Sequence, residues 1–177
     1  MVTEAKTPKS ALREWTEAAC IALVAILTLY FVFWPVRIDG DSMEDTLHNG
    51  DRMCISRLMF NAGLVHRGDI VVCTVDEQQG VDGRRDIIKR LIGLPGDHIE
   101  IKEGQVWVNG ELQDEPYVGS VHTNGCVDCV LASDEYYVMG DNRDVSEDSR
   151  IMGPIPKSRM VARVILRWYP FNQVRLY

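Results

Sequence analysis

The longest run of apolar positions lies near the start of the chain. Residues 18–36 contain no charged side chain, and about 20 apolar residues in a helix span the hydrocarbon core of a bilayer. Trp15, Tyr30 and Trp34 stand near the ends of this run, where aromatic side chains favour the membrane interfaces. A buried core helix and a cleavable signal peptide are the alternatives, but the bulky exit at residues 33–36 is unlike a small-x-small cleavage site. The pattern predicts one uncleaved transmembrane helix.

After residue 36 the pattern changes to many short strands. Residues 69–75 are rich in β-branched side chains and follow the turn pair Arg67-Gly68. Residues 106–108 run into Asn109-Gly110, the strongest short hairpin signal. Further strand-like stretches lie at residues 87–92, 99–101, 136–139 and 160–168. Helical periodicity is nearly absent here, and residues 56–60 are too short to assign. The sequence therefore predicts an all-β, barrel-like domain preceded by the transmembrane helix.

The distribution of basic residues around the apolar run indicates its orientation. Three lie before the run and two lie at similar range after it, and basic residues favour the cytoplasmic side. These residues are Lys6, Lys9 and Arg13 before the run, and Arg37 and Arg52 after it. We expect a cytoplasmic tail at residues 1–17, a single-pass anchor in the plasma membrane at residues 18–36, and an extracytoplasmic domain at residues 37–177.

Composition excludes several classes of protein. The chain of 177 residues suffices for one domain with a core, and its net charge of −7 argues against nucleic acid as a partner. Five cysteines without two CxxC pairs favour neither a disulfide scaffold nor a zinc site, so no metal is expected. Cys126 and Cys129 form one Cys-x-x-Cys, which would be a structural disulfide in an oxidising compartment or remain reduced.

Candidate chemistry centres on a serine that follows the apolar run. Ser42 needs a base, because a serine hydroxyl at its free pKa is a poor nucleophile. Lys89 is the candidate: on a strand it shares a face with Ile87 and Leu91, and desolvation by such neighbours lowers the pKa of a lysine. The alternative is a solvated lysine in a charged patch. The basic residues of that patch would be Arg84, Arg85 and Arg90.

Other catalytic arrangements have less support. The sequence contains no Gly-x-Ser-x-Gly elbow, no Ser-x-x-Lys and no His-Glu-x-x-His. His48, His66 or His98 would have to serve a Ser-His-Asp triad, and none lies in a motif-like context.

Four blocks resemble, in order, the sequence boxes of one enzyme family. They read GDSMEDTL at residues 40–47, RGDIVV at 67–72, IKRLIGLPGD at 88–97 and GDNRDVSEDSR at 140–150. With the preceding apolar run, they make the chain similar to the bacterial type I signal peptidases (leader peptidases) of the short, single-anchor form. These are serine endopeptidases with a Ser/Lys dyad. One such box would be a weak signal, but four in order behind an anchor are specific.

The resemblance implies roles for particular residues. Ser42 would be the nucleophile, Lys89 the general base, and Ser146 would orient the lysine by a hydrogen bond. The Ser42 N–H would stabilise the oxyanion, near Gly40, which lacks the hydroxyl that some relatives carry there; Asp45 replaces the proline of the family box. The supporting residues would be Asp141, Arg143, Asp148 and Arg150. The substrate pockets would be lined by Ile38, Met43, Leu47, Ile87 and Ile88.

The resemblance also implies a substrate and partners. The enzyme would act as a monomer without a cofactor, at the bilayer, and remove signal peptides from pre-proteins after an Ala-x-Ala site. Residues 37–41 alone separate the anchor from Ser42, so the nucleophile would work within ~17 Å of the apolar run. A self-cleaving Ser/Lys repressor-type protease and a non-catalytic, membrane-tethered β module are the alternative functions.

Overall fold

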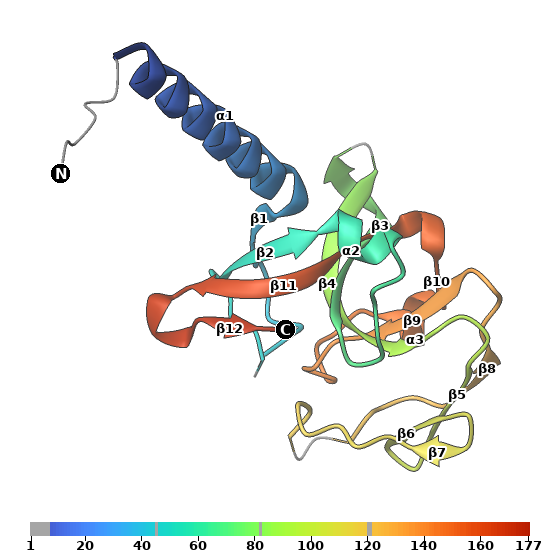
Figure 1. Cartoon of the computed structure of the whole chain (residues 1–177). Coiled ribbons are helices and arrows are strands. Elements are labelled where there is room, and N and C mark those ends of the chain that lie inside the picture. The colour runs from blue at the N-terminus through green and yellow to red at the C-terminus, as the bar shows by residue number, and fades with distance from the viewer. Residues whose placement is uncertain (1–7, 45, 82, 120–121) are drawn as a thin grey trace. The chain divides into compact units, whose positions relative to one another are not determined.

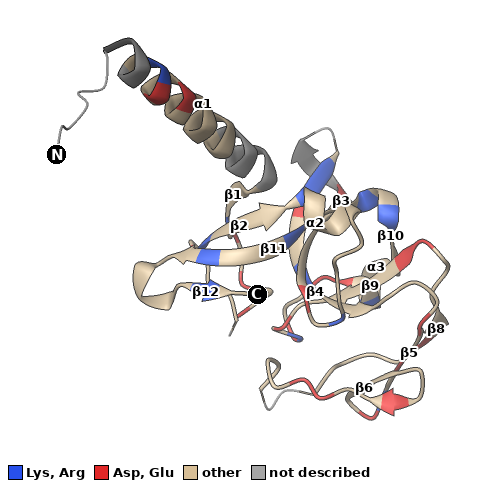
Figure 2. Cartoon of the chain, viewed as in Figure 1, with Lys and Arg blue, Asp and Glu red and all other residues tan. Residues whose placement is uncertain are grey.

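The computed structural model describes residues 8–44, 46–81, 83–119 and 122–177. The chain divides into two compact units, Met1–Trp34 and Pro35–Tyr177. The first contains helix α1 (Pro8–Val32), in which the described charges lie in the early turns and are followed by uncharged residues (Figure 2). Arg13 Nε donates to Glu17 Oε1 at 2.8 Å, a pair with the i, i+4 spacing that stabilises helices.

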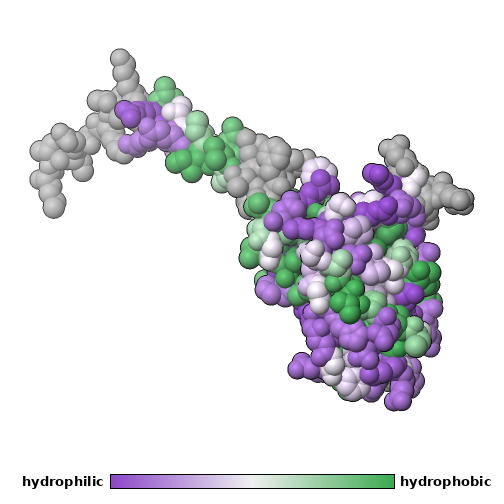
Figure 3. Space-filling view, turned by 90° about the vertical axis from the view of Figure 1, so that its right-hand side faces the viewer, coloured by the Kyte–Doolittle hydropathy of each residue, from purple (hydrophilic) through white to green (hydrophobic). Residues whose placement is uncertain are grey.

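The middle of α1 is apolar, as the green atoms of this helix show in Figure 3. The large apolar side chains described there are more than half exposed; they are Leu12, Trp15, Ile21, Leu23, Val24 and Ile26. Among the described residues, no helix has the length and apolar character needed to cross a membrane. The side chains of residues 27–32, part of the predicted transmembrane segment, lie outside the described part of the chain.

The second unit is built around an eight-stranded sheet (Figure 1). Its order is β1-β2-β11-β3-β4-β9-β10, and β12 pairs with β11. Strand β4 is central: it pairs antiparallel with β3 on one side and with β9 on the other. The strands of this sheet are β1 (Trp34–Arg37), β2 (Arg52–Ser56), β3 (Ile70–Val81), β4 (Arg84–Gly93), β9 (Glu135–Met139), β10 (Ile155–Pro156), β11 (Met160–Tyr169) and β12 (Arg175–Leu176).

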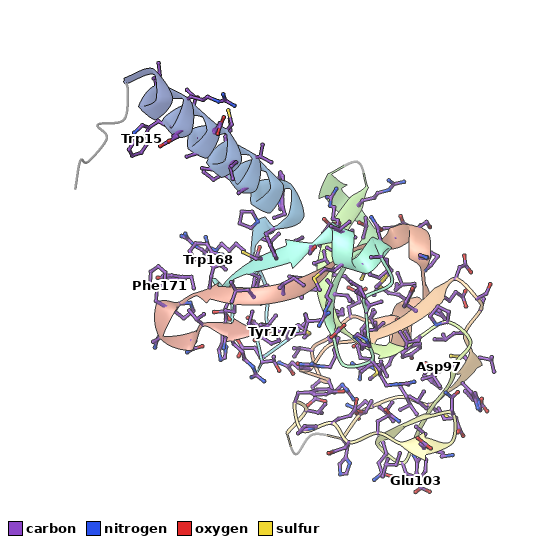
Figure 4. All side chains as sticks on the ribbon, viewed as in Figure 1. Trp15, Asp97, Glu103, Trp168, Phe171 and Tyr177 are labelled. Atoms are coloured by element: carbon purple, nitrogen blue, oxygen red, sulfur yellow. The ribbon has the colours of Figure 1, made fainter. Side chains whose placement is uncertain are left out.

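A smaller sheet of four strands has the order β7-β6-β5-β8. Its strands are β5 (His98–Lys102), β6 (Gln105–Val108), β7 (Glu111–Leu112) and β8 (Val127–Val130). The predicted hairpin turn joins β6 to β7: Asn109 and Gly110 have φ of 54° and 80°, as a two-residue turn with both central φ positive requires. In Figure 4 the labelled Asp97 and Glu103 lie just before β5 and just after it.

Short helices connect the strands. The side chain of Ser56 caps α2 (Arg57–Asn61) and accepts from the Met59 N–H, while Asp148 caps α3 (Ser149–Met152). The 3₁₀ turns η1 (Lys157–Arg159) and η2 (Phe171–Gln173) flank β11. At the end of β11, the rings of Trp168 and Phe171 lie 6.3 Å apart, centroid to centroid (Figure 4).

The structure confirms the prediction of a domain dominated by β-strands, while the described strands of the larger sheet do not close into the barrel-like arrangement that was expected. The larger sheet runs from β1 to β10 without returning to β1, so it is open. Apolar side chains cover both of its faces, because alternate residues of β3 enter different buried clusters. Val71, Cys73 and Val75 enter one cluster, and Ile70 and Val72 enter the other.

Candidate active site

The structure brings Ser42 and Lys89 together, 47 positions apart in the chain. Lys89 Nζ donates a hydrogen bond to Ser42 Oγ at 2.6 Å. Ser42 lies in a turn in which the Thr46 and Leu47 N–H groups donate to the Met43 carbonyl. Met43 and Leu47 are buried in the core, which fixes the turn beside β4.

Lys89 is one of the most buried cations in the described part of the chain. Only 3% of its surface is exposed. It pairs across the sheet with Val71 and shares a face with Ile87 and Leu91, as the strand periodicity predicts. This burial lowers the pKa of Lys89, and the Asp148 carboxylate acts in the opposite direction without reversing the shift.

The loop of residues 140–150 contains a buried ion pair, Asp148 with Arg150. Asp148 is fully buried and accepts hydrogen bonds from Arg150 Nε and Nη2, each at 2.9 Å, and from the Gly140 N–H at 3.0 Å. Burial alone would raise the pKa of Asp148, but Arg150 and the Gly140 N–H hold it below its usual value. The carboxylate therefore stays charged and ties the two ends of the loop together.

The other two predicted supporting residues also have buried partners. Asp141 receives two hydrogen bonds from Arg90, at 2.7 and 2.5 Å. Arg143 donates to both oxygens of Glu115, at 3.0 and 2.7 Å, and to the Gly140 carbonyl. The sequence gave no reason to single out Glu115, although Arg90 could have been noticed as the direct neighbour of Lys89.

Ser146 is buried but does not form the predicted hydrogen bond to Lys89. Among the residues that the structure describes, Ser146 Oγ has no hydrogen-bond partner. Its hydroxyl is nevertheless near enough to Asp148 to help lower the pKa of that carboxyl group. Ser146 packs instead against Gly140. A Cβ at position 140 would overlap both the Ser146 side chain and the Ser42 carbonyl oxygen, so only glycine fits this close approach.

Asn142 holds the turn that contains Ser42 by two hydrogen bonds and was not predicted. Its N–H donates to the Ser42 carbonyl and its Nδ2 to the Asp41 carbonyl, both at 3.1 Å. The only sequence signal was its position within the fourth block.

A cleft of about 480 Å³ opens beside Ser42 and Lys89. Four of the five predicted pocket residues line it: Ile38, Met43, Ile87 and Ile88. Leu47 does not; it is fully buried in the core behind the turn, so its assignment to a pocket is wrong. Gly40 also lines the cleft, with φ of +106°, and Asp45 lies outside the described residues.

The remaining candidates lie elsewhere. His66 and His98 neighbour Asp69 and Asp128, and His48 neighbours Glu44; within the described chain none of them is hydrogen-bonded to Ser42. Cys126 and Cys129 are both free thiols.

Comparison with known proteins identifies the family. The family model described as "Signal peptidase, peptidase S26" matches residues 12–169. The chain belongs to this signal peptidase family. The chain is 38% identical to signal peptidase I S of Bacillus subtilis (strain 168), over 99% of this chain and 98% of that protein. It is 37% identical to signal peptidase I of Bacillus licheniformis, over 98% of each.

Two further matches are a protein of Staphylococcus aureus and a solved structure. Signal peptidase IB of Staphylococcus aureus is 31% identical, over 94% of each chain. A crystal structure of a signal peptidase I from Enterococcus faecalis V583 superposes with a TM-score of 0.47 at 23% identity, covering 56% of this chain and 95% of that one. Membership in this signal peptidase family makes the chain a serine endopeptidase.

Proposed function

We propose that this signal peptidase removes signal peptides from secretory pre-proteins, with Ser42 as the nucleophile and Lys89 as the general base. One observation carries the proposal: a lysine that is 3% exposed lies 2.6 Å from a serine hydroxyl at the edge of a cleft. A buried lysine with a lowered pKa can be neutral near physiological pH, which a base requires.

The chemistry follows from this geometry. Neutral Lys89 takes the proton of Ser42 as Oγ attacks the scissile carbonyl, and the resulting ammonium returns it to the departing amine. Water then attacks the acyl-enzyme, with Lys89 again as the base. Asp148 is held by Arg150 and Gly140, so it remains charged while Lys89 changes state.

The backbone N–H of Ser42 is the proposed donor to the oxyanion. Within the described chain this N–H has no hydrogen-bond acceptor, and the Ser42 carbonyl is held by Asn142, which fixes the orientation of the turn. Such a preorganised donor stabilises charge as it develops on the carbonyl oxygen.

The cleft supports specificity for small residues. An extended peptide places alternate side chains on one side, so the first and third residues before the cut would enter the cleft together. Ile38, Met43, Ile87 and Ile88 would leave room there for alanine-sized groups.

The apolar segment at residues 18–36 supports attachment to the membrane. The described apolar side chains of α1 are exposed, as in a helix that faces lipid. We propose residues 1–17 as the cytoplasmic tail and residues 37–177 as a monomeric domain at the outer surface of the plasma membrane.

Family membership favours this function over a self-cleaving repressor-type protease, and the contact between Ser42 and Lys89 disfavours a non-catalytic module.

Cleavage of a secretory pre-protein by the full chain in detergent tests the proposed function. We expect a cut after Ala-x-Ala. Replacement of the first or third residue before the cut by Phe should reduce kcat/KM at least ~100-fold, whereas replacement of the middle residue should change it less than ~3-fold. Efficient cleavage of a substrate with Phe as the first or third residue before the cut would refute this interpretation of the cleft.

A further inference from the structure

A turn outside all four sequence blocks contacts two arginines that lie beside the candidate active site. The segment from Glu115 to Val118 is closed by a hydrogen bond from the Val118 N–H to the Glu115 carbonyl at 3.0 Å. Pro116 occupies the second position, where its fixed φ favours a β-turn, and Val118 is buried. We call these four residues the 115–118 turn.

The first contact of this turn is to Arg90, the residue that follows Lys89. The guanidinium of Arg90 lies 3.8 Å from the centre of the Tyr117 ring. Arg90 also donates to Asp141 and to the Gly68 carbonyl. Tyr117 therefore covers a buried cation that directly follows Lys89 on β4.

The second contact is to the loop of residues 140–150. Glu115 accepts two hydrogen bonds from Arg143, whose side chain is fully buried. Tyr117 Oη also donates to Glu115, at 3.1 Å, which joins the two contacts.

The two arginines bind two successive residues, one through its backbone and the other through its side chain. Arg143 donates to the Gly140 carbonyl, and Arg90 binds the side chain of the next residue, Asp141. Gly140 packs directly against the Ser42 carbonyl and the Ser146 side chain. A small shift at Gly140 would therefore move the nucleophile relative to its base.

We propose that Glu115 and Tyr117 are positioning residues, which hold Ser42 against Lys89 by fixing Arg143 and Arg90, the two arginines that bind Gly140 and Asp141. The inference rests on the proposed Ser42–Lys89 pair. Neither residue touches the cleft, so both act through the arginines. The small sheet thereby contributes to catalysis through the connection that leaves β7.

Kinetics of full-length Glu115→Gln and Tyr117→Leu in detergent test the proposal, with Tyr117→Phe and Glu111→Gln as matched variants. A misplacement on the scale of 1 Å reduces a rate ~100-fold, so we expect kcat at pH 7 to fall ~10- to 100-fold in the first two variants, with KM within ~3-fold. Tyr117→Phe keeps the ring over Arg90 and should retain most activity. Glu111 is exposed on β7, and its variant should match the parent.

The pH profile separates positioning from simple loss of folded protein. Misplacement of Ser42 lowers kcat at every pH, and a loosened loop that admits water to Lys89 raises its apparent pKa. The deficit in kcat should therefore be largest at low pH and should persist in part at high pH, while the circular dichroism spectrum stays that of the folded chain. An unchanged kcat in both variants with folded circular dichroism spectra would overturn the proposal. Tyr117→Phe as impaired as Tyr117→Leu would overturn the assigned role of the ring.

Ser42→Ala and Lys89→Ala, measured alongside, distinguish this failure from that of the proposed function. If they are inactive while Glu115→Gln and Tyr117→Leu match the parent, only the positioning role is wrong. If Lys89→Ala is active, the proposed function itself fails.

Discussion

At the scale of single residues, Lys89 carries the largest conflict between stability and function. A charged ammonium is expensive to bury, and the strand places this one on an apolar face with only 3% of its surface exposed. Its one described hydrogen-bond partner is Ser42 Oγ, a neutral group. The fold therefore favours the neutral amine, the state that accepts a proton.

This conflict predicts how stability depends on pH. Since burial lowers the pKa of Lys89 below its ordinary value of 10.5, the unfolded chain binds this proton more tightly than the folded chain. The free energy of unfolding should therefore rise with pH between the folded-state pKa and 10.5. Lys89→Met removes this penalty: it should be inactive but more stable at pH 7, and its advantage should shrink toward pH 10.5.

Thermal unfolding at several pH values measures this effect. In a chain of this size, a change of 1 kcal/mol shifts the Tm by ~2–4 °C. Lys102→Met is the control, because Lys102 is half exposed beside Glu100. A Lys89→Met variant that is less stable than the parent at every pH would contradict the burial argument.

At the scale of secondary-structure elements, the sequence predicted the strands that have a β-branched or alternating pattern, but not β1, β2 and β8. The β-branched pattern and the Asn-Gly turn located β3, β4, β6, β9 and β11, because period-2 alternation and φ-positive turn residues are local signals. Short strands such as β10 and β12 were missed, since two residues carry no periodicity and are defined by their partners. The helix α2 was left unassigned because its five residues are too few to show helical periodicity.

The sequence predicted the loop residues of the candidate site but not their partners from distant parts of the chain. The fourth block identified Asp141, Arg143, Asp148 and Arg150, but not the partners of the first two. Arg90 and Glu115 lie 51 and 28 positions away from Asp141 and Arg143. Only the fold brings such residues together, so local patterns cannot reveal the pairs. Leu47 was misplaced because its assignment came from the resemblance of its block, which does not tell whether a side chain in a turn faces the cleft or the core.

The buried ion pair between Arg90 on β4 and Asp141 in the loop of residues 140–150 gives a prediction at the scale of elements. Asp141→Asn leaves Arg90 charged without its carboxylate, and loss of one partner of a buried pair destabilises by ~3–5 kcal/mol. Replacing both, as Arg90→Met with Asp141→Leu, should destabilise less than the sum of the two single changes. Chemical denaturation of the four proteins measures the coupling, and strictly additive effects would show that the pair is not a unit.

At the scale of the whole molecule, the sequence predicts an apolar segment followed by a β-rich domain. The change from one uncharged run to alternating strands at residue 36 lies close to the division of the chain after Trp34. The sequence could not show that the larger sheet is open, because closure depends on which edge strands meet.

The central claim is that Ser42 and Lys89 form one catalytic unit, and turnover of a secretory pre-protein by single variants of the full chain tests it most directly. Ser42→Ala, Lys89→Ala and Lys89→Arg should each lose at least ~1,000-fold in kcat while keeping the circular dichroism spectrum of the parent. Lys89→Arg should be inactive because arginine cannot give up its proton. The double variant should be no worse than either alanine variant. Substantial turnover by folded Lys89→Ala would contradict the account.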